Sequence, residues 1–543
     1  MKNINSLDRA LAIFEEFYRY AGLRLNYTKT EVLWLGGNTR RGTVCGLNLI
    51  TEPTKVLGVI LCKNSDETIS INVNSRIQKL QILLNLWKQR SLSIKGRITI
   101  VKTQALPLIL FIGGFIYMPS DKLDEIQKIL YDFVWPKGKH HVKNLTLIED
   151  IRSGGLKMPD IHCMIKALKL TWLKRMTKHN NNVNATAKHI LKTDDIENLL
   201  ISKNHVKYLG KIPKFYVQLL SLWHSLHNTE PLTTSDVLEE IIWDNEKILV
   251  GNKPLRNINW LKAGVCKIKD IVDDQCILYS KNTLKQIFKV KCEDMYYNSL
   301  IAAIPKQWLN KIKLKTLKEI IRPTGPHLTI LINKKLVKID ELKCSDIYWS
   351  EVHKKSERPT SYEKWETEYY YINFDWEHIN QTPYNCARET SLQSLQYQII
   401  NRYFPCGEML HIWKIKPNNL CDTCQKFDTL QHYFVDCPKV KLFWNCLKTW
   451  FKYNFDFVIN FGPLDILFGI PNYLKNLELD VFNFIILYAK MYIKQCKENK
   501  KATEFYEFQI DLKERILIEQ QILYSNGKKN LFDQKWNKLL ENL

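Results

Sequence analysis

Apolar residues recur at helical spacing along most of the chain, and only two short stretches near the N-terminus have a strand-like pattern. Between residues 7 and 21, leucine, phenylalanine and tyrosine return every three or four positions, which predicts an amphipathic helix that Gly22 ends. The apolar runs at 31–35 and 56–61 are short and lie beside or contain glycine, so each predicts one strand. A small α/β element is therefore expected at the N-terminus.

The rest of the chain has mainly helical patterns, so the predicted fold class is mainly α. Pro107 is expected to bend or end one of these helices, because proline lacks the amide N–H that a helix interior needs. The stretch 180–380 is mixed and mostly helical, with loops expected at 322–326 and 358–360. One clear helical pattern begins at residue 71. The other clear helical patterns cover 94–105, 123–133, 392–403 and the charged tail 477–543.

The charge of the chain indicates a class of binding partner, and its cysteine content indicates a cellular compartment. The 79 Lys and Arg residues exceed the 56 Asp and Glu residues by 23, which favours a polyanionic partner such as nucleic acid over a merely well-solvated basic surface. The chain has 14 cysteines but no secretory signal pattern, so we expect reduced thiols in an intracellular, nuclear or cytoplasmic protein that is not secreted. The longest apolar run, 105–118, is shorter than the roughly 20 residues of a membrane span, so no membrane partner is expected.

One motif has the spacing of a metal site. Cys421, Cys424, His432 and Cys437 form the pattern C-x2-C-x7-H-x4-C. Three thiolates and one imidazole can close a tetrahedron around one structural Zn2+ and leave no position for a substrate water. The alternative is three ordinary buried cysteines and an unrelated histidine; Cys406 and His411 lie upstream with a less suitable spacing.

No comparable motif predicts catalysis. Two-metal polymerases need carboxylates that converge from separate strands. The pairs Asp194-Asp195 and Asp273-Asp274 lack the aromatic-x-Asp-Asp hairpin context, and we interpret them as solvated acidic turns. The sequence has no Ser/His/Asp arrangement and no phosphate-binding glycine loop, and no small-molecule substrate is expected.

Several short motifs, taken in order, resemble the C-terminal part of LINE-type non-LTR retrotransposon reverse transcriptases. Residues 22–31 resemble the family's G-L-x-x-N-x-x-K-T-E stretch, and 55–59 resemble its K-Y-L-G-I primer-grip strand. Residues 93–107 look like its thumb motif, and 154–160 with Trp172 resemble the segment that follows. The cysteine cluster, then 443–444, 465–469 and Trp536, are similar to the family's zinc-knuckle-like ending.

The resemblance implies a division into five ranges and a loss of polymerase activity. The family's catalytic aspartates would precede Met1, so the chain is expected not to be an enzyme. Lys29 matches a lysine thought to assist nucleotide addition in the family, but this role is not expected without the aspartates that bind the catalytic metal ions. The implied ranges are a palm remnant at 1–62, a thumb-like domain at 63–178, a helical connector at 179–385, a zinc-knuckle-like region at 386–450 and a C-terminal helical tail at 451–543.

The thumb-like segment concentrates positive charge. Such residues are expected to contact phosphates of RNA or DNA in a largely sequence-independent, salt-sensitive way, with Lys439 and Lys441 beside the cysteine cluster as a weaker second contact. Together with Lys29, the predicted nucleic-acid-binding residues are Lys88, Arg90, Lys95, Arg97 and Lys102.

Three hypotheses about function follow. The leading one is a truncated, reverse-transcriptase-like protein that binds nucleic acid without polymerising it. The second is the tail of a longer, active RNA-directed DNA polymerase whose upstream part is missing from the gene model. The third is a co-opted host protein that binds nucleic acid or protein. Genomic sequence upstream of Met1 would separate the first two.

Overall fold

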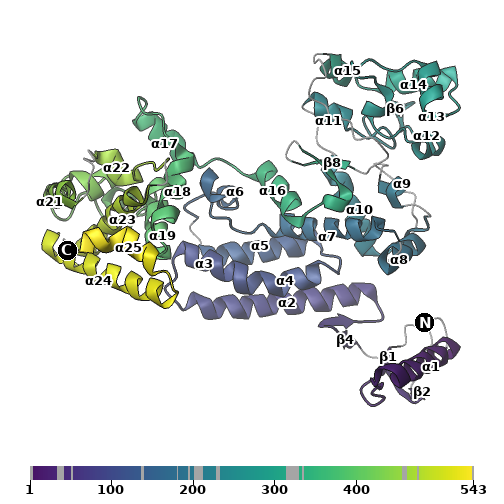
Figure 1. Cartoon of the computed structure of the whole chain (residues 1–543), viewed down its shortest axis with the longest axis horizontal. Coiled ribbons are helices and arrows are strands. Elements are labelled where there is room, and N and C mark those ends of the chain that lie inside the picture. Colours follow the sequence, from purple (N-terminus) through teal and green to yellow (C-terminus); the bar gives the residue numbers. More distant parts are fainter. Residues whose placement is uncertain are drawn as a thin grey trace. The chain divides into compact units, whose positions relative to one another are not determined.

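The computed structural model has a mainly helical fold with few short strands, as the pattern predicted (Figure 1). Contacts divide the chain into two compact units, each built from separate segments. Unit 1 contains residues 1–83, 105–126 and 161–350, and unit 2 contains 84–104, 127–160 and 351–543. The structure describes residues 4–33, 42–50, 53–135, 140–179, 181–193, 196–200, 212–227, 233–313, 329–332, 335–454, 461–473 and 476–540.

The N-terminal α/β element of unit 1 has the predicted helix and a small mixed sheet. Helix α1 (Ile4–Ala21) ends at Gly22, which takes a positive φ of 67° and donates its N–H to the Tyr18 carbonyl. Strand β1 (Glu31–Leu33) pairs in parallel with β3 (Leu47–Ile50), and β2 (Thr43–Val44) pairs with β3 in the antiparallel sense. Most of the apolar face of α1 is exposed, including Ile13, Phe14 and Phe17.

The prediction of one strand over 56–61 was wrong, because this segment is a hairpin. Strands β4 (Thr54–Val56) and β5 (Val59–Leu61) are antiparallel, with Val56 paired to Val59. The two residues between them, Leu57 and Gly58, have positive φ values of 47° and 85°, as a two-residue hairpin turn requires. Leucine rarely adopts this conformation, so the unbroken apolar run concealed the turn.

Pro107 is accommodated by a change of helix type. Helix α3 (Ile94–Ile100) is followed by a π-helical turn (Val101–Ala105) and then by α4 (Leu106–Gly113), in which Pro107 lies in the first turn, where no N–H is needed. Among the described residues, the stretch Ile94–Gly113 alone is long and apolar enough to cross a membrane, and 44% of its most apolar window is buried. Core helices of soluble proteins meet the same criteria, so this is weak evidence for a span.

Unit 1 has a hydrophobic core around buried tryptophans. Trp243, Trp260 and Trp308 are almost fully buried there with aliphatic side chains from residues 237–312. The other α-helices and strands between residues 65 and 355 are α2 (Ser65–Lys88), α5 (Ser120–Val134), α6 (Asn144–Leu147), α7 (Ile161–Thr177), α8 (Asn182–Leu191), α9 (Ile196–Leu200), α10 (Lys214–His227), α11 (Thr234–Leu238), β6 (Leu249–Val250), β7 (Lys253–Pro254), α12 (Ile258–Lys262), α13 (Lys281–Phe288), α14 (Asp294–Ala303), α15 (Lys306–Lys313), β8 (Thr329–Ile332), β9 (Lys335–Lys338) and α16 (Cys344–Lys355). The predicted loop at 322–326 lies outside the described residues.

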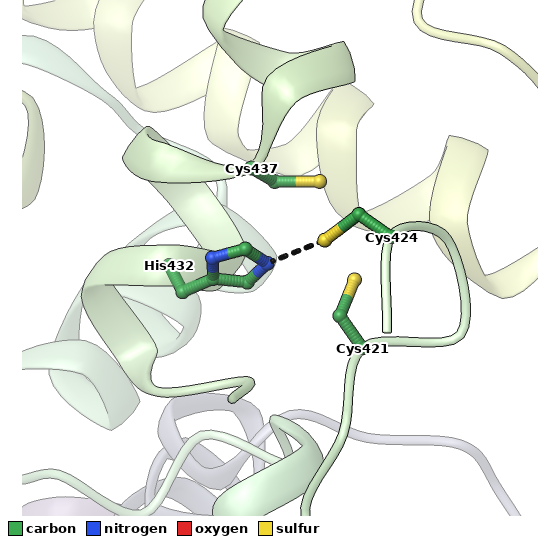
Figure 2. Close-up of side chains that lie close together, drawn as sticks. All are labelled: Cys421, Cys424, His432 and Cys437. Atoms are coloured by element: carbon green, nitrogen blue, oxygen red, sulfur yellow. Dashed lines mark hydrogen bonds between the residues drawn. The ribbon is translucent and has the colours of Figure 1, made fainter. Parts of the chain in front are cut away.

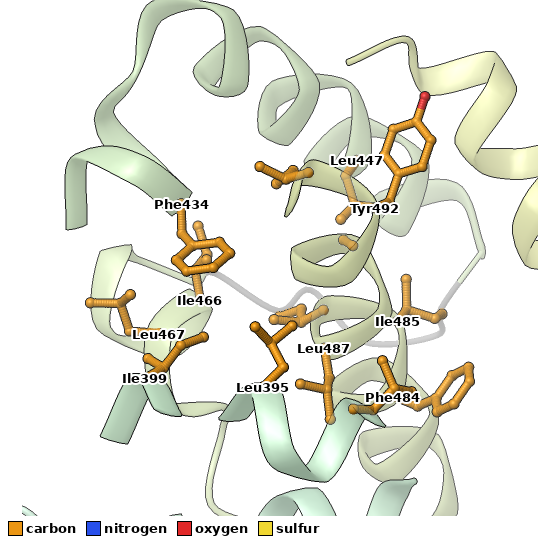
Figure 3. Close-up of a cluster of buried hydrophobic side chains, with 14 of the residues drawn as sticks. Leu395, Ile399, Phe434, Leu447, Ile466, Leu467, Phe484, Ile485, Leu487 and Tyr492 are labelled. Atoms are coloured by element: carbon orange, nitrogen blue, oxygen red, sulfur yellow. The ribbon is translucent and has the colours of Figure 1, made fainter. Parts of the chain in front are cut away.

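Unit 2 is organised around one long buried helix, α23 (Leu477–Glu498), which contacts α18, α19, α24 and α25. Figure 3 shows part of this core, with Phe484, Ile485 and Leu487 of α23 packed among side chains of other segments. The other helices of this region are α17 (Thr360–Glu368), α18 (Trp376–Cys386), α19 (Thr390–Ile400), α20 (Gly407–Ile412), a π-helical turn (His432–Asp436), α21 (Pro438–Asn454), α22 (Pro463–Phe468), α24 (Phe505–Ser525) and α25 (Lys529–Leu540).

This core extends across several of the ranges that the resemblance implied. It includes residues from Tyr362 to Leu539 and the cysteines 421 and 437, so the cysteine-rich segment is part of a larger hydrophobic domain. Helix α3, which lies in the predicted thumb-like range, packs against α19 in the same unit. The five-range division itself stays a prediction.

Lys490 should make the stability of unit 2 depend on pH. Its ammonium group is fully buried, donates to Gln396 and to the Leu467 carbonyl, and burial lowers its pKa to about 7 from 10.5. Because the unfolded chain holds this proton up to higher pH, stability should rise from about pH 7 upward, by at most about 1.4 kcal/mol per pH unit. Lys490→Met should flatten this rise, which denaturant unfolding at pH 7 to 9.5 measures; an unchanged slope would contradict the assignment.

Candidate metal centre and basic surface

The side chains of Cys421, Cys424, His432 and Cys437 converge on one point in unit 2 (Figure 2). One potential ligand atom from each residue lies within 4.8 Å of all the others, and Cys424 Sγ is 3.2 Å from His432 Nε2. A tetrahedral ion with metal–sulfur bonds of about 2.3 Å would separate its sulfur ligands by about 3.8 Å. The predicted cluster is therefore compatible with one structural metal site.

A tight turn aims the first two cysteines at that point. Leu420 and Phe427 form an isolated antiparallel bridge, and Cys421 N–H donates to the Lys426 carbonyl at 2.8 Å. Gln425 takes a positive φ of 59° and donates its N–H to the Cys421 carbonyl. This closed loop fixes the spacing between Cys421 and Cys424, which is the function of a C-x2-C turn in such sites.

A π-helical turn supplies His432, and the residue directly after this turn is Cys437. The His432 N–H donates to Thr429 Oγ1 at 3.1 Å, and the Cys437 N–H donates to the His432 carbonyl at 3.0 Å, directly before α21 begins. Trp444 of α21 donates its indole N–H to the Phe434 carbonyl, so the turn is attached to the hydrophobic core. Cys437 is fully buried and Cys424 is half-buried.

Lys497 of α23 favours the thiolate forms. Its ammonium donates to the Tyr433 carbonyl at 2.9 Å and lies over the Tyr433 ring. Burial raises the pKa of a thiol, but at Cys421 the backbone N–H groups of Thr423 and Cys424 and the charge of Lys497 bring the pKa below its ordinary value. At Cys437, burial and the neighbouring cysteines outweigh Lys497 and raise the pKa to about 11. Sequence spacing gave no indication of Lys497, which lies 60 residues downstream of Cys437.

The alternative ligands lie elsewhere. Cys406 and His411 are not part of the convergent group found among the described residues. His411 Nδ1 is 3.2 Å from the Lys416 carbonyl oxygen, and burial raises the pKa of the Cys406 thiol to about 11. Three sulfurs and one imidazole fill all four positions of a tetrahedron, so an ion held there would have a structural role.

The predicted nucleic-acid-binding residues separate into four environments, and Arg97 has one of its own. Lys29 is exposed in the turn before β1 in unit 1, with its N–H held by Asn26. Lys88 and Arg90 are exposed beside the C-terminus of α2, and the Arg90 guanidinium lies 5.1 Å from the centre of the Trp87 ring. Lys95 and Lys102 are half-buried in unit 2.

Arg97 is buried, unlike the other five residues that were predicted to bind nucleic acid. Its guanidinium donates to the carbonyls of Leu92 and Phe133 at 3.3 and 2.9 Å and lies over the Phe133 ring. Burial lowers its pKa, and it forms no ion pair with a carboxylate among the described residues. Arg97 therefore joins α3 to the end of α5, which a helical charge pattern does not reveal.

Lys157 interacts electrostatically with Lys95 and Lys102, and these three residues are called the lysine cluster. The pKa of Lys102 is lowered to about 8 by burial and by the charges of Lys95 and Lys157, with Asp150 acting in the opposite direction. Burial and the charge of Lys157 likewise lower the pKa of Lys95. Asp150 forms an ion pair with Lys157 at 2.7 Å. Two cations and one carboxylate thus act on Lys102, and the carboxylate, Asp150, is paired with Lys157.

A glycine loop brings Lys157 to this position. Any Cβ at Gly155 would lie 2.2 Å from the Glu149 carbonyl oxygen, so only glycine fits, and Lys157 itself has a positive φ of 56°. Buried Glu149 fixes the loop by accepting from Ser356 Oγ at 2.7 Å and lying 2.6 Å from His353 Nδ1. The glycine pair was a visible signal in the sequence, but it did not indicate which residue the loop would present.

Of the two acidic pairs, Asp194-Asp195 lies outside the described residues. Asp273 begins a turn and accepts the N–H groups of Gln275 and Ile277 with one carboxylate oxygen, as an acidic turn does. No protein-family model matches this chain.

Proposed function

We propose that this protein binds single-stranded or double-stranded RNA or DNA, largely independently of sequence, through the lysine cluster of unit 2. The observation that carries the proposal is a group of three lysines in which the charges of Lys95 and Lys157 both act on Lys102, while Lys157 is paired with Asp150 at 2.7 Å. Phosphates placed there would relieve the mutual repulsion of the lysines and release counterions. The net charge of +23 supports the same class of partner.

The metal centre has a structural role in this proposal, and its ion is Zn2+. Three cysteines and one histidine form a donor set that Zn2+ prefers in closed tetrahedral sites. Lys439 and Lys441 at the start of α21 adjoin the centre and supply a second, weaker phosphate contact. The ion would join the C-x2-C turn to α21, and through α21 to the hydrophobic core around α23.

The order of motifs supports a retrotransposon origin: a chain similar to the C-terminal part of a LINE-type reverse transcriptase, intracellular and without polymerase activity of its own. Three or more His, Cys, Asp or Glu side chains converge only at the metal centre in the part of the chain that the structure describes. That centre has no carboxylate with which to hold two catalytic magnesium ions.

Equilibrium binding tests the proposal. Fluorescence anisotropy with a labelled 20-nucleotide single-stranded RNA should give a slope of log Kobs against log salt of about −2 or steeper, because each phosphate contact to a single strand contributes about −0.7. Affinity at fixed salt should also fall between pH 7 and pH 9, because Lys102 loses its proton near pH 8. Binding that is absent at 50 mM salt, or that does not respond to salt, would contradict the proposal.

A second candidate is the C-terminal portion of an active RNA-directed DNA polymerase. The exposed apolar face of α1, with Ile13 66% and Phe17 52% exposed, favours it, because such a face is normally covered by another part of a protein. Primer extension on an RNA template with Mg2+ separates the two candidates. We expect no template-dependent extension by this chain, and extension that survives stringent purification would favour the polymerase.

A further inference from the structure

A pocket of about 490 Å3 lies within unit 2, apart from the metal centre's four ligands. Its walls come from α3, the end of α5, α19, α23 and the segments that follow α19 and α20. The volume is within the range of about 300–1,000 Å3 that is usual for small-ligand sites. None of the described residues that line it is Asp or Glu, whereas Arg97 and Lys494 contribute positive charge.

Four aromatic side chains form one wall of this pocket: Trp135, His141, Tyr403 and Trp413. The His141 and Tyr403 rings are stacked, with centroids 5.0 Å apart and planes 4° apart. The Trp413 ring lies 4.8 Å from His141 at 47°, and the Trp135 ring meets Tyr403 edge-on. His141 and Trp413 are half-exposed, whereas Trp135 and Tyr403 are buried, so the aromatic stack is accessible at one end.

The polar groups of the lining favour a flat ligand with hydrogen-bonding edges and an attached anion. Three buried polar atoms of the lining residues, Trp135 Nε1, Ser394 Oγ and Tyr403 Oη, have no hydrogen-bond partner among the described residues. Burying such groups without a partner is unfavourable, so a ligand with acceptors would be stabilised here once small side-chain movements expose them. Lys494 is paired with Glu498 at 3.1 Å, which leaves Arg97 as the cation without a carboxylate among the described residues.

We propose that this pocket binds one unpaired nucleobase, stacked on the aromatic wall, with its phosphate near Arg97 and Lys494. The inference rests on the proposed nucleic-acid binding and adds a base-dependent contact to the phosphate contacts of the lysine cluster. Every base has a π-face, so the contact is sequence-tolerant. A purely aliphatic ligand would leave the three polar atoms without a partner and Arg97 without an anion. The base comes either from a single strand or from a free nucleotide.

The test compares a fluorescein-labelled dT12 with an abasic 12-mer of the same backbone length and charge. Wild-type protein should bind dT12 about 5- to 150-fold more tightly, the range that stacking of one base spans. The double variant His141→Ala/Trp413→Ala should lose most of this preference and keep its affinity for the abasic strand. Trp413→Phe should keep the preference, as should Tyr453→Ala, which removes an aromatic residue that is 83% exposed on α21.

The outcomes separate this inference from the function on which it rests. Equal affinities for dT12 and the abasic strand, or a preference that persists in the folded double variant, would overturn the base site and leave phosphate binding intact. Failure to bind either strand would contradict the proposed function, and binding of thymidine monophosphate alone would identify a free nucleotide as the source. If the double variant does not fold, photo-crosslinking of wild type to 4-thiothymidine in dT12 replaces it. Crosslinks to Trp135, His141, Tyr403 or Trp413 would support the site, and their absence would contradict it.

Discussion

Purified protein should contain one zinc ion per chain, and Cys424→Ser should remove it and lower the thermal unfolding midpoint of unit 2 by about 10 °C or more. Structural zinc contributes about 10–16 kcal/mol of apparent binding free energy in small zinc domains. Loss of about 5 kcal/mol shifts the midpoint of a domain of 150–250 residues by about 10–20 °C. The expected effect is large even if the hydrophobic core retains most of its own stability.

The structure explains why the loss should reach beyond the loop. Cys437 lies directly before α21, and α21 packs into the core that contains α23. If the ion were removed, Cys421 and Cys437 would lose their common ligand, and among the described residues Lys497 is the cation whose charge acts on both. The loop at 415–430 and the start of α21 would then lose the cross-link between them.

Elemental analysis by mass spectrometry together with calorimetry measures both parts of this prediction. Cys424 is the suitable position because its side chain is only half-buried, so the serine leaves little cavity. Cys406→Ser is the matched control, since Cys406 is a nearby buried cysteine outside the convergent group. Full zinc occupancy in Cys424→Ser, or zinc loss in Cys406→Ser, would show that the ligand set is wrong.

The metal centre could be predicted from sequence because its ligands lie within 17 residues and their spacing is dictated by one turn and one helix start. The helices were predictable for a similar reason, since apolar periodicity is local. Turns in which a residue other than glycine takes a positive φ could not be predicted. Leu57 lies in such a hairpin turn, and Arg402 has a positive φ shortly after α19, which ends before the predicted helix would reach Tyr403. Such conformations are imposed by the surrounding structure and leave little trace in composition.

Contacts between segments that lie far apart in the sequence could not be predicted from the sequence either. The charge pattern around α3 predicted a basic surface, but it could not show that Arg97 turns inward to the Phe133 carbonyl while Lys157, about 60 positions away, joins Lys95 and Lys102. The division into two units, each made of three separate segments, is likewise a property of long-range packing. Residue spacing alone does not encode either feature.

Replacing the lysine cluster should weaken nucleic-acid binding more than any other change of equal charge. In Lys95→Gln/Lys102→Gln/Lys157→Gln, three phosphate contacts are lost, so affinity for single-stranded RNA at 0.15 M salt should fall on the order of 10- to 100-fold. Each lysine is at least partly exposed, and glutamine keeps most of the apolar stem that packs along the surface. Arg97 is left unchanged, because its replacement would disturb the junction of α3 with α5.

A charge-matched control separates the site from net charge. Lys452, Lys513 and Lys528 are exposed lysines of unit 2 outside the cluster. Changing these three to glutamine lowers the net charge by the same amount, so a general electrostatic effect would weaken binding equally in both triple variants. We expect the control variant to lose only a few-fold in affinity, because long-range charge effects are screened beyond about 8 Å at this salt concentration.

The most direct test of nucleic-acid binding by the lysine cluster is therefore the salt dependence of RNA binding, measured side by side for the wild type and the two triple variants. If the lysine cluster contacts phosphates, the slope of log Kobs against log salt should become less negative by about 2 in the cluster variant, because three contacts contribute about 0.7 each, and should stay nearly unchanged in the control. Identical slopes for all three proteins would contradict the assignment of nucleic-acid binding to the lysine cluster.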